Sequence, residues 1–372
     1  ASLPPARAYH SAVAVGNTML VAFGQALPAR TVYDDVWRFG FATREWSRVA
    51  ATGPAPAGRF GGSAVAYGLL AVFFGGINAA GAYTETLAAL NTNTSTWLAL
   101  KELGPAPGPR AHHAATMLGD RMYIFAGVTT GARRVADLHS YSFRLSAWAI
   151  VVGHAGVVPA RSHFALLSDA VAGDALVIGG HGAVTLMDRY RLHGAAQLND
   201  THWAINATRL GSALAPPAVN RDVIRAEFAA VRAGAHVALC GGGISPSFPM
   251  RLGASCVHYD AQRGENALMQ PMPLPTTGSS AVYYGRSMYV FGGQVAYEAI
   301  KAAAAVNYLQ IMTVAAAQMC AAGAVADAAG CLHCSAGTLN PECAAAQRGW
   351  YAPAPYRAAV PCPRGTFSAA VG

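Results

Sequence analysis

Short apolar segments separated by turn residues make up most of the chain. Close to the amino terminus they cover residues 11–15, 19–23 and 36–39, and a fourth segment surrounds Trp46. Glycine, asparagine, proline and aspartate stand between them, and the pair Gly16-Asn17 is typical of a tight β-hairpin. This pattern predicts four short antiparallel strands that together form a β-meander.

The same pattern recurs with a nearly constant period. An apolar residue entering a glycine pair, or a close variant of it, returns at spacings of 51, 51, 53, 62 and 51 residues. These sites are Phe23-Gly24, Phe74-Gly75-Gly76, Phe125-Ala126-Gly127, Ile178-Gly179-Gly180, Cys240-Gly241-Gly242 and Phe291-Gly292-Gly293. An upstream marker stands at Arg7, Arg59, Arg110, Arg161, Arg225 and Thr276, and a tryptophan follows at Trp46, Trp97, Trp148 and Trp203. Three markers with one period predict a repeated β-fold, with each tryptophan on an outer strand against the neighbouring unit.

Composition excludes two other classes of protein. The 40 glycines and 21 prolines interrupt the chain too often for a bundle of long helices. Apolar residues make up 53% of the chain and charged residues 12%, which is the reverse of what a disordered chain shows.

The repeats resemble those of the kelch family. In the first unit the likeness is carried by Arg7-Ala8-Tyr9-His10-Ser11-Ala12, Phe23-Gly24, Asp35-Val36-Trp37-Arg38-Phe39 and Trp46. In the third unit it is carried by Arg110-Ala111-His112-His113, Phe125-Ala126-Gly127, Asp137-Leu138-His139-Ser140-Tyr141 and Trp148. The resemblance implies an all-β fold, a six-bladed kelch-type β-propeller over residues 1–312. Unit five departs from the pattern at Glu227 and Phe228, where histidine is expected. Unit six shows no clear fourth strand, so the manner of closure stays open.

The resemblance also implies a binding surface. In such propellers the loops between the second and third strands emerge on the face that usually binds partners, and function tends to lie in such loops. The candidate binding residues in these loops are Arg30, Tyr33, Asn78, Tyr83, Arg133, Arg134, His181, Phe248, Arg251 and Tyr297. For most of them an ordinary solvated loop position is the alternative.

All seven cysteines lie in the later part of the chain. Cys240 ends the second expected strand of unit five and Cys256 lies in its third, so we expect a cross-strand disulfide, with two buried free thiols as the alternative.

Residues 313–372 are expected to form an alanine-rich linker and a small cysteine-rich segment. Cys331-Leu332-His333-Cys334 is half of a zinc motif, but the second half is missing, so we expect disulfides rather than a metal there. The candidate disulfide cysteines are Cys320, Cys331, Cys334 and Cys343. With Cys362 the segment holds five cysteines, so we expect one of the five to bond to sequence beyond Gly372, and the connectivity stays open. The run 361–368 resembles the ephrin-receptor-like cysteine-rich repeats of extracellular proteins. The lack of an initiator methionine and this run at the other end indicate part of a longer polypeptide.

Three N-glycosylation motifs, at Asn93, Asn199 and Asn206, agree with an oxidising compartment. Together with the cysteines they predict an extracellular or cell-surface protein from the secretory pathway, and an intracellular kelch scaffold is the alternative. The uncharged stretch 302–326 is mostly alanine, so we expect no membrane span.

Charge and motifs bound the function. The net charge of +8 comes from arginines scattered along the chain, which does not predict nucleic-acid binding and is compatible with an acidic protein surface or an anionic glycan. Motifs of hydrolases, phosphate loops and metal helices are missing, so we expect no catalytic residue, no cofactor and no bound metal. The recurring histidines, including His10, His112, His113 and His163, are expected to pack or to hydrogen-bond at the blade turns.

The sequence therefore predicts a module that binds protein or glycan partners within a larger extracellular assembly. A carbohydrate-active enzyme or a copper-radical oxidase is the alternative. The oxidase would need a tyrosine cross-linked to cysteine and histidines that converge at the channel, and no cysteine stands out for that role.

Overall fold

The computed structural model describes residues 3–182, 189–211, 226–243, 252–253, 255–261, 265–297 and 302–314, together with the backbone of six short strands between residues 324 and 361. The chain divides into two compact units, residues 1–312 and 313–372, and each is described by itself. In the first unit Phe248 and Arg251 lie outside the described residues, and so do Cys320, Cys334 and Cys343 in the second.

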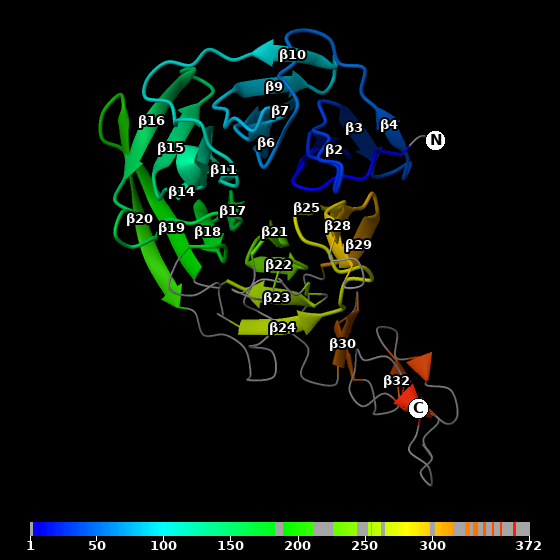
Figure 1. Ribbon diagram of the computed structural model, residues 1–372. Coiled ribbons are helices and arrows are strands. Elements are labelled where there is room, and N and C mark those ends of the chain that lie inside the picture. Colours follow the sequence, from blue (N-terminus) through cyan, green and yellow to red (C-terminus); the bar gives the residue numbers. More distant parts are fainter. Residues whose placement is uncertain are drawn as a thin grey trace. The chain divides into compact units, whose positions relative to one another are not determined.

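The first unit consists of antiparallel sheets that each come from one continuous stretch of chain, as Figure 1 shows. Three four-stranded meanders are β1 (Ser11–Val15), β2 (Thr18–Ala22), β3 (Val36–Gly40), β4 (Trp46–Arg48); β6 (Ser63–Tyr67), β7 (Leu70–Phe74), β9 (Leu87–Asn91), β10 (Thr96–Ala99); and β11 (Ala114–Leu118), β12 (Arg121–Phe125), β15 (Leu138–Ser142), β16 (Ala147–Val152). Two more are β17 (Ala165–Asp169), β18 (Asp174–Ile178), β19 (Arg189–Gln197), β20 (His202–Gly211); and β21 (Ala229–Ala233), β22 (His236–Cys240), β23 (Cys256–Asp260), β24 (Glu265–Met269). The last sheet has the order β25 (Ser280–Tyr284), β26 (Ser287–Phe291), β29 (Leu309–Thr313).

Smaller pairs decorate these sheets. They are β5 (Arg59–Phe60) with β8 (Ile77–Asn78), β13 (Val128–Thr129) with β14 (Arg133–Arg134) around a 3-10 turn at Thr130–Ala132, and β27 (Gln294–Tyr297) with β28 (Ala302–Ala305). A short parallel pairing of β16 with β20 also joins the third and fourth sheets. Within the described residues, the last sheet has three strands, as the weak pattern of the sixth unit predicts.

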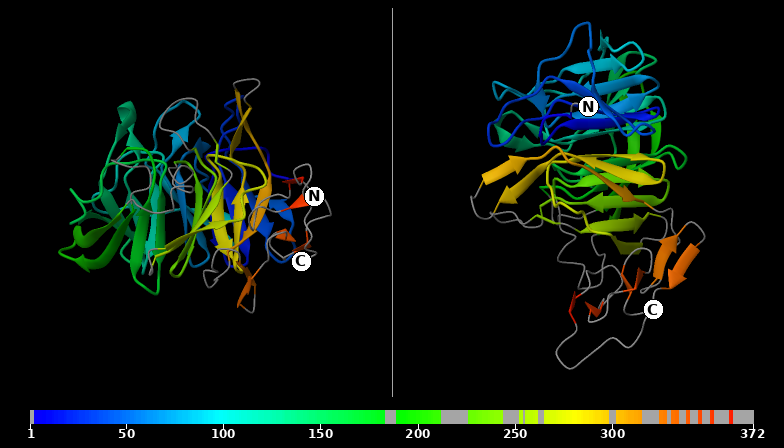
Figure 2. Two further views of the ribbon diagram at one scale, coloured as in Figure 1. Left: turned by 90° about the horizontal axis from the view of Figure 1, so that it is seen from below. Right: turned by 90° about the vertical axis from the view of Figure 1, so that its right-hand side faces the viewer.

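The first strands of the sheets contact one another around a ring. The contacts follow the order β1, β6, β11, β17, β21 and β25, and β25 in turn contacts β1. Figure 2 shows the same unit from two further sides. No strand from the beginning of the chain joins the last sheet in the described part, so the ends of the ring meet by packing and by backbone hydrogen bonds outside the strands, such as that from Gly293 N–H to the Arg7 carbonyl at 2.8 Å.

The recurrence of aromatic residues along the chain has a packing explanation. Trp97 packs on Phe23 of the first sheet, with ring centroids 6.1 Å apart, and Trp148 packs on Phe74 of the second, at 5.5 Å. Trp97 and Trp148 therefore lie on outer strands and reach the phenylalanine of the preceding sheet, as predicted. Trp203 differs, because its ring lies 4.2 Å from the guanidinium of Arg121 and the buried Ile205 packs with Phe125 instead.

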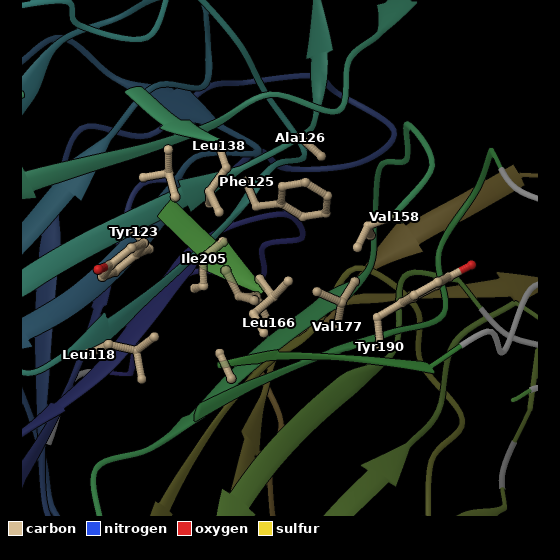
Figure 3. Close-up of a cluster of buried hydrophobic side chains, with 13 residues drawn as sticks. Leu118, Tyr123, Phe125, Ala126, Leu138, Val158, Leu166, Val177, Tyr190 and Ile205 are labelled. Atoms are coloured by element: carbon tan, nitrogen blue, oxygen red, sulfur yellow. The ribbon is translucent and has the colours of Figure 1, made fainter. Parts of the chain in front are cut away.

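Figure 3 shows one of these inter-sheet cores, between the third and fourth sheets. Phe125 and Leu138 from the third sheet meet Val177 and Tyr190 from the fourth, and all four are buried. Burying a side chain of this size stabilises the fold by roughly 1.5–3 kcal/mol, so several such residues at each interface hold neighbouring sheets together.

The repeated glycines are required by a close approach between strands. Gly24 and Gly127 have φ values of +91° and +101°, a region that favours glycine. An added Cβ would lie 2.7 Å from the Cβ of His10 or His113, respectively. A side chain at either glycine would force the start of the first strand away from the end of the second.

The repeated arginines are buried and hold the loop that follows the second strand. Arg7 donates from Nη1 to the carbonyl of Phe23 at 2.9 Å and forms a two-bond ion pair with Asp35, at 2.7 and 3.0 Å. Arg110 does the same with Ala126 and Asp137. Their recurrence therefore reflects a structural role in every unit where the arginine is described.

The described part of the second unit consists of three short strand pairs. They are β30 (Ala324–Asp327) with β31 (Gly330–His333), β32 (Thr338–Leu339) with β33 (Ala344–Ala345), and β34 (Trp350–Tyr351) with β35 (Val360–Pro361). Cys331 lies in β31, where only the backbone is described. Across the described chain, no helix is long and apolar enough to cross a membrane.

Candidate functional site at the centre of the ring

One repeat position lies at the centre of the ring, two residues after each arginine marker. Its six occupants, called here the inner-ring residues, are Tyr9, Gly61, His112, His163, Glu227 and Gly278. All six have positive φ values, between 53° and 68°. For the four that are not glycine, this backbone region costs of order 1–3 kcal/mol each, so the surrounding structure must hold them there.

A closed circle of backbone hydrogen bonds holds these residues. The N–H of each inner-ring residue donates to the carbonyl of the one in the preceding sheet, over 2.7–3.1 Å, from Gly61 to Tyr9 and so on around to Gly278. The N–H of Tyr9 donates to Gly278 at 2.8 Å and completes the circle. The left-handed backbone therefore gains one inter-sheet hydrogen bond at every position, and the centre of the ring is rigid.

The side chains of Tyr9, His112, His163 and Glu227 at this position gather with that of His181, from the loop after β18, into what we call the inner cluster. The rings of His112 and His163 stack at a centroid distance of 3.9 Å, and Tyr9 and His181 meet them edge-on, at 5.6 and 5.3 Å. The glycines in the circle make room for these rings. A Cβ on Gly61 would lie 2.7 Å from His112, and one on Gly278 would lie 2.8 Å from Tyr9.

Glu227 is the charged group of the inner cluster. Its Oε2 accepts hydrogen bonds from Tyr9 Oη and from Thr277 Oγ1, both at 2.8 Å, and Tyr9 Oη in turn accepts one from Gln294 at 3.0 Å. Its Oε1 faces His163 Nε2 and His181 Nε2, each at 3.7 Å. One carboxylate oxygen is thus held by hydroxyl groups, and the other is directed at two imidazoles.

Burial sets the protonation of this cluster. Burial lowers the pKa of His112 to about 3, assisted by the neighbouring His163, and lowers the pKa of His163 to about 4 despite the charge of Glu227. Burial by itself would raise the pKa of Glu227, but polar contacts with His181, His163, Thr277 and Tyr9 lower it to about 2. At neutral pH the centre of the ring therefore presents the neutral imidazoles of His112 and His163 beside the carboxylate of Glu227.

The structure places the described members of the predicted binding set at the same end of the sheets as the inner cluster. Because Ser11 pairs with Ala22, the start of β1 lies beside the end of β2, where the loop to the third strand begins. His181 lies in the inner cluster itself. Arg134 reaches its border, where Nε donates to Ser162 Oγ at 3.2 Å. These two candidates are brought together; among the other described candidates, Arg133 lies next to Arg134, and Arg30, Tyr33, Asn78, Tyr83 and Tyr297 lie in other loops.

The remaining candidates differ in exposure. Arg30 and Arg133 are exposed, whereas Tyr33 is half-buried with the guanidinium of Arg7 4.5 Å above its ring. Asn78 accepts hydrogen bonds from the backbone N–H groups of residues 80 and 82, so its side chain shapes its own turn. Tyr83 is half-buried, and for Tyr297 only the backbone of β27 is described.

Sequence reasoning did not place Tyr9, His112, His163 and Glu227 in the site. The signal was present, because all four stand at one repeat position, but equivalence within a repeat does not reveal that the position faces a common centre. A packing role does hold for His113, whose Nε2 lies 2.8 Å from Ser63 Oγ of the neighbouring sheet.

Two further sets of predicted residues can be located. Cys240 and Cys256 pair directly across β22 and β23 and are joined by a disulfide, and the sulfur of Met312 lies 3.4 Å from Cys256 Sγ. Asn93, Asn199 and Asn206 are all exposed, the first two in turns between third and fourth strands and the last on β20.

Comparison with known proteins gives the following similarities. The model of the KLHDC2/KLHL20/DRC7 Kelch-repeats domain matches residues 9–242. Kelch domain-containing protein 3 of Rattus norvegicus is 29% identical over 195 residues, which is 49% of either chain, so this chain spans about half the length of that relative. Host cell factor 1 of Homo sapiens is 27% identical over 210 residues, 51% of this chain and 10% of the relative. Among solved structures, the structure of YjhT matches with a TM-score of 0.65 at 13% identity, over 84% of this chain and 97% of that one, which shows similarity of fold.

Proposed function

The chain belongs to the kelch-repeat family, and from that premise we propose that it is a six-bladed propeller that binds a protein partner. The partner contacts the face of the propeller where the loops between second and third strands emerge, next to the inner cluster. Kelch-repeat domains are protein-interaction scaffolds. The observation that carries the proposal is the closed circle of backbone hydrogen bonds beneath loops that present exposed arginines. A rigid base lowers the entropic cost of ordering the loops on binding.

The number of blades rests on the same circle. Its six members come one from each sheet, and each donates to the sheet before it. The side chains of the inner cluster meet at the centre of this circle, which supports a propeller whose partner binds on the face rather than within the channel.

The charge of the loops supports an acidic protein surface as the partner. Arg30 and Arg133 are exposed in loops of the first and third sheets, and the chain carries a net charge of +8. Positively charged loops accelerate association with a negatively charged partner and disfavour binding of positively charged partners. An anionic glycan is also negatively charged, and the experiment below distinguishes a glycan partner from a protein partner.

Affinity capture with matched charge variants tests the binding face. The double variant Arg30→Glu/Arg133→Glu reverses charge on the proposed face, and Arg44→Glu/Arg144→Glu makes the same change in β3–β4 and β15–β16 turns at the opposite end of the sheets. We expect partners captured by the intact protein to be lost from the first variant and kept by the second. Equal capture by both variants would refute the assigned face, and capture abolished by glycosidase treatment would identify a glycan.

We further propose that the protein works outside the cytosol, as part of a larger surface assembly. Support comes from the direct pairing of Cys240 with Cys256 and from the exposure of Asn93, Asn199 and Asn206. The cysteines of residues 313–372 would form the disulfide-rich, ephrin-receptor-like continuation. Mass spectrometry of the native protein, with and without reductant and peptide-N-glycosidase, tests this. Free thiols and bare asparagines would favour the intracellular kelch scaffold instead.

A copper-radical oxidase is the second candidate function, and one feature favours it. Tyr9 and three imidazoles meet at the centre of the ring, as that chemistry requires. However, the two cysteines whose side chains are described are bonded to each other on β22 and β23, so neither is available to cross-link Tyr9. We therefore place binding before catalysis, and an assay for alcohol oxidation with added copper separates the two.

A further inference from the structure

We propose that His163, His181 and Glu227 form a binding site for a divalent transition-metal ion such as Zn²⁺ at the centre of the ring. The candidate ligand atoms of the three side chains lie within 4.8 Å of one another. Within the part of the chain that the structure describes, no other group of three such side chains converges in this way. This inference concerns the inner cluster alone and is independent of the proposed partner binding, and it revises the expectation that the protein holds no metal.

The distances between Glu227 Oε1 and the two imidazole nitrogens fit joint binding of one metal ion better than direct hydrogen bonds. His163 Nε2 and His181 Nε2 are each 3.7 Å from Glu227 Oε1, which is beyond the 2.7–3.2 Å of an N–H···O hydrogen bond. Two ligands that each lie about 2.0–2.1 Å from a tetrahedral Zn²⁺ are about 3.3 Å apart. Shifts of a few tenths of an ångström would therefore bring each imidazole nitrogen to that distance from Glu227 Oε1, and the three candidate ligand atoms already lie within 4.8 Å of one another.

Outer contacts orient the ligand atoms. His163 Nδ1 lies 3.1 Å from Ser162 Oγ, and that oxygen also accepts a hydrogen bond from Arg134. With the imidazole proton directed to Ser162, Nε2 keeps its lone pair for a metal. Glu227 is oriented in the same way, because hydroxyl groups of Tyr9 and Thr277 occupy Oε2 and leave Oε1 for the ion. Partners of this kind fix ligand geometry in known metal sites.

The backbone positions all three ligands before any ion arrives. His163 and Glu227 belong to the circle of inter-sheet hydrogen bonds, and the N–H of Glu227 donates to the carbonyl of His163 at 3.1 Å. His181 comes from the loop after β18 and exchanges two backbone hydrogen bonds with Ser162, at 2.8 and 2.9 Å. A site built on such a frame loses little entropy when it binds.

The ligand set and its exposure indicate the class of ion. Two imidazoles and one carboxylate suit Zn²⁺ and its first-row neighbours, and three protein ligands leave a coordination position open. The side chains of His163, His181 and Glu227 are 18%, 28% and 10% exposed, so an ion can enter from solvent and an exogenous ligand can reach it. His112 stacks on His163 and limits movement of that ring.

Titration of the metal-free full chain with Zn²⁺ tests the site. After treatment with a chelator, isothermal titration calorimetry should show one ion per chain, and Co²⁺ should give the visible absorption of a low-symmetry site without thiolate bands. Glu227→Gln and His181→Ala should each weaken Zn²⁺ binding at least about tenfold, the lower end of what loss of even an outer partner costs. His193→Ala serves as the matched control, because His193 is half-buried on β19, away from the inner cluster, and its ring nitrogen lies 3.0 Å from Thr208 Oγ1. The Zn²⁺ affinity of this variant should equal that of the unchanged protein.

The variants distinguish loss of the metal site from loss of the fold. Glu227→Gln keeps the size of the side chain, and thermal unfolding of each variant shows whether it is folded. If no ion binds with one-to-one stoichiometry, or if binding survives in both Glu227→Gln and His181→Ala, the proposal is refuted. Binding that survives together with cobalt–thiolate bands would place the ion on cysteines of residues 313–372. Failure here leaves the partner capture by Arg30→Glu/Arg133→Glu unaffected.

Discussion

Trp46 on β4 of the first sheet packs against Phe291 on β26 of the last sheet, with ring centroids 4.9 Å apart. The same relationship joins Trp148 to Phe74 and Trp97 to Phe23 within the chain. Trp46 therefore repeats the contact of Trp97 and Trp148 but makes it between the two ends of the repeat array. The fold closes by reusing an internal interface, without exchanging a strand.

Removal of the closing contact should destabilise the ring. We expect Trp46→Ala to lower the free energy of unfolding by about 3–5 kcal/mol, the usual cost of truncating a buried tryptophan. Urea unfolding followed by fluorescence and circular dichroism measures it. Leu69→Ala, at a position that is 58% exposed, is the control and should change stability by less than about 0.5 kcal/mol. A loss below about 1 kcal/mol for Trp46→Ala would mean that this packing does not hold the ends together.

Replacement of a repeat glycine should cost more than replacement of a turn glycine. Gly127→Ala places a Cβ 2.7 Å from His113 Cβ at a φ of +101°, so overpacking and backbone strain add to roughly 2–4 kcal/mol. Gly119→Ala has a φ of +60° and nothing within 4 Å, and strain alone should cost about 1 kcal/mol. Chemical unfolding of both variants gives the comparison. Equal losses would contradict the role given to the close approach.

Neutralisation of Asp35 in the buried ion pair with Arg7 should lower the free energy of unfolding. Arg7 is fully buried and Asp35 is 10% exposed, so Asp35→Asn leaves a buried guanidinium without its counter-charge, at a cost of roughly 3–5 kcal/mol. Asp120→Asn breaks a pair with Arg144 whose side chains are 53% and 77% exposed, and should cost less than about 1 kcal/mol. Thermal unfolding at pH 7 measures the difference. A small loss for Asp35→Asn would show that water compensates Arg7.

Stability should fall as the pH decreases below neutrality. Burial, assisted by the charge of Arg7, lowers the pKa of His10 to about 3, and burial with the charge of Arg110 lowers that of His113 to about 3. The unfolded chain binds protons at these histidines near pH 6.5 and the folded chain does not, so stability is complete above pH 6.5 and decreases from there toward pH 3.

Phenylalanine substitutions test this pH dependence. Phe164 and Phe228 occupy the position equivalent to His10 and His113 in the fourth and fifth sheets, so His10→Phe and His113→Phe should fold. Both variants should show a shallower decrease of the unfolding temperature between pH 7 and pH 4 than the unchanged protein. An unaltered pH profile in the double variant would show that other groups govern acid unfolding.

The periodic residues of the sequence determined the repeated four-stranded units, the outer tryptophans and the kelch family, because each unit buries its own apolar pattern and pairs its own strands. Even the special glycines were visible, since one conformation is needed at the same point of every unit. Arg30, Arg133, Arg134 and His181 could be assigned to one end for the same reason.

Only the tertiary structure decided what happens at the centre of the ring. Glu227 reads in the sequence as a departure from the repeat, and His163 reads as a regular member of it, yet Glu227 Oε1 lies 3.7 Å from His163 Nε2. The local sequence pattern predicts where a residue lies within its own sheet. Which side chains meet across an axis depends on how the sheets pack around it, and that packing is determined by contacts such as Trp46 with Phe291 between residues at opposite ends of the repeat array.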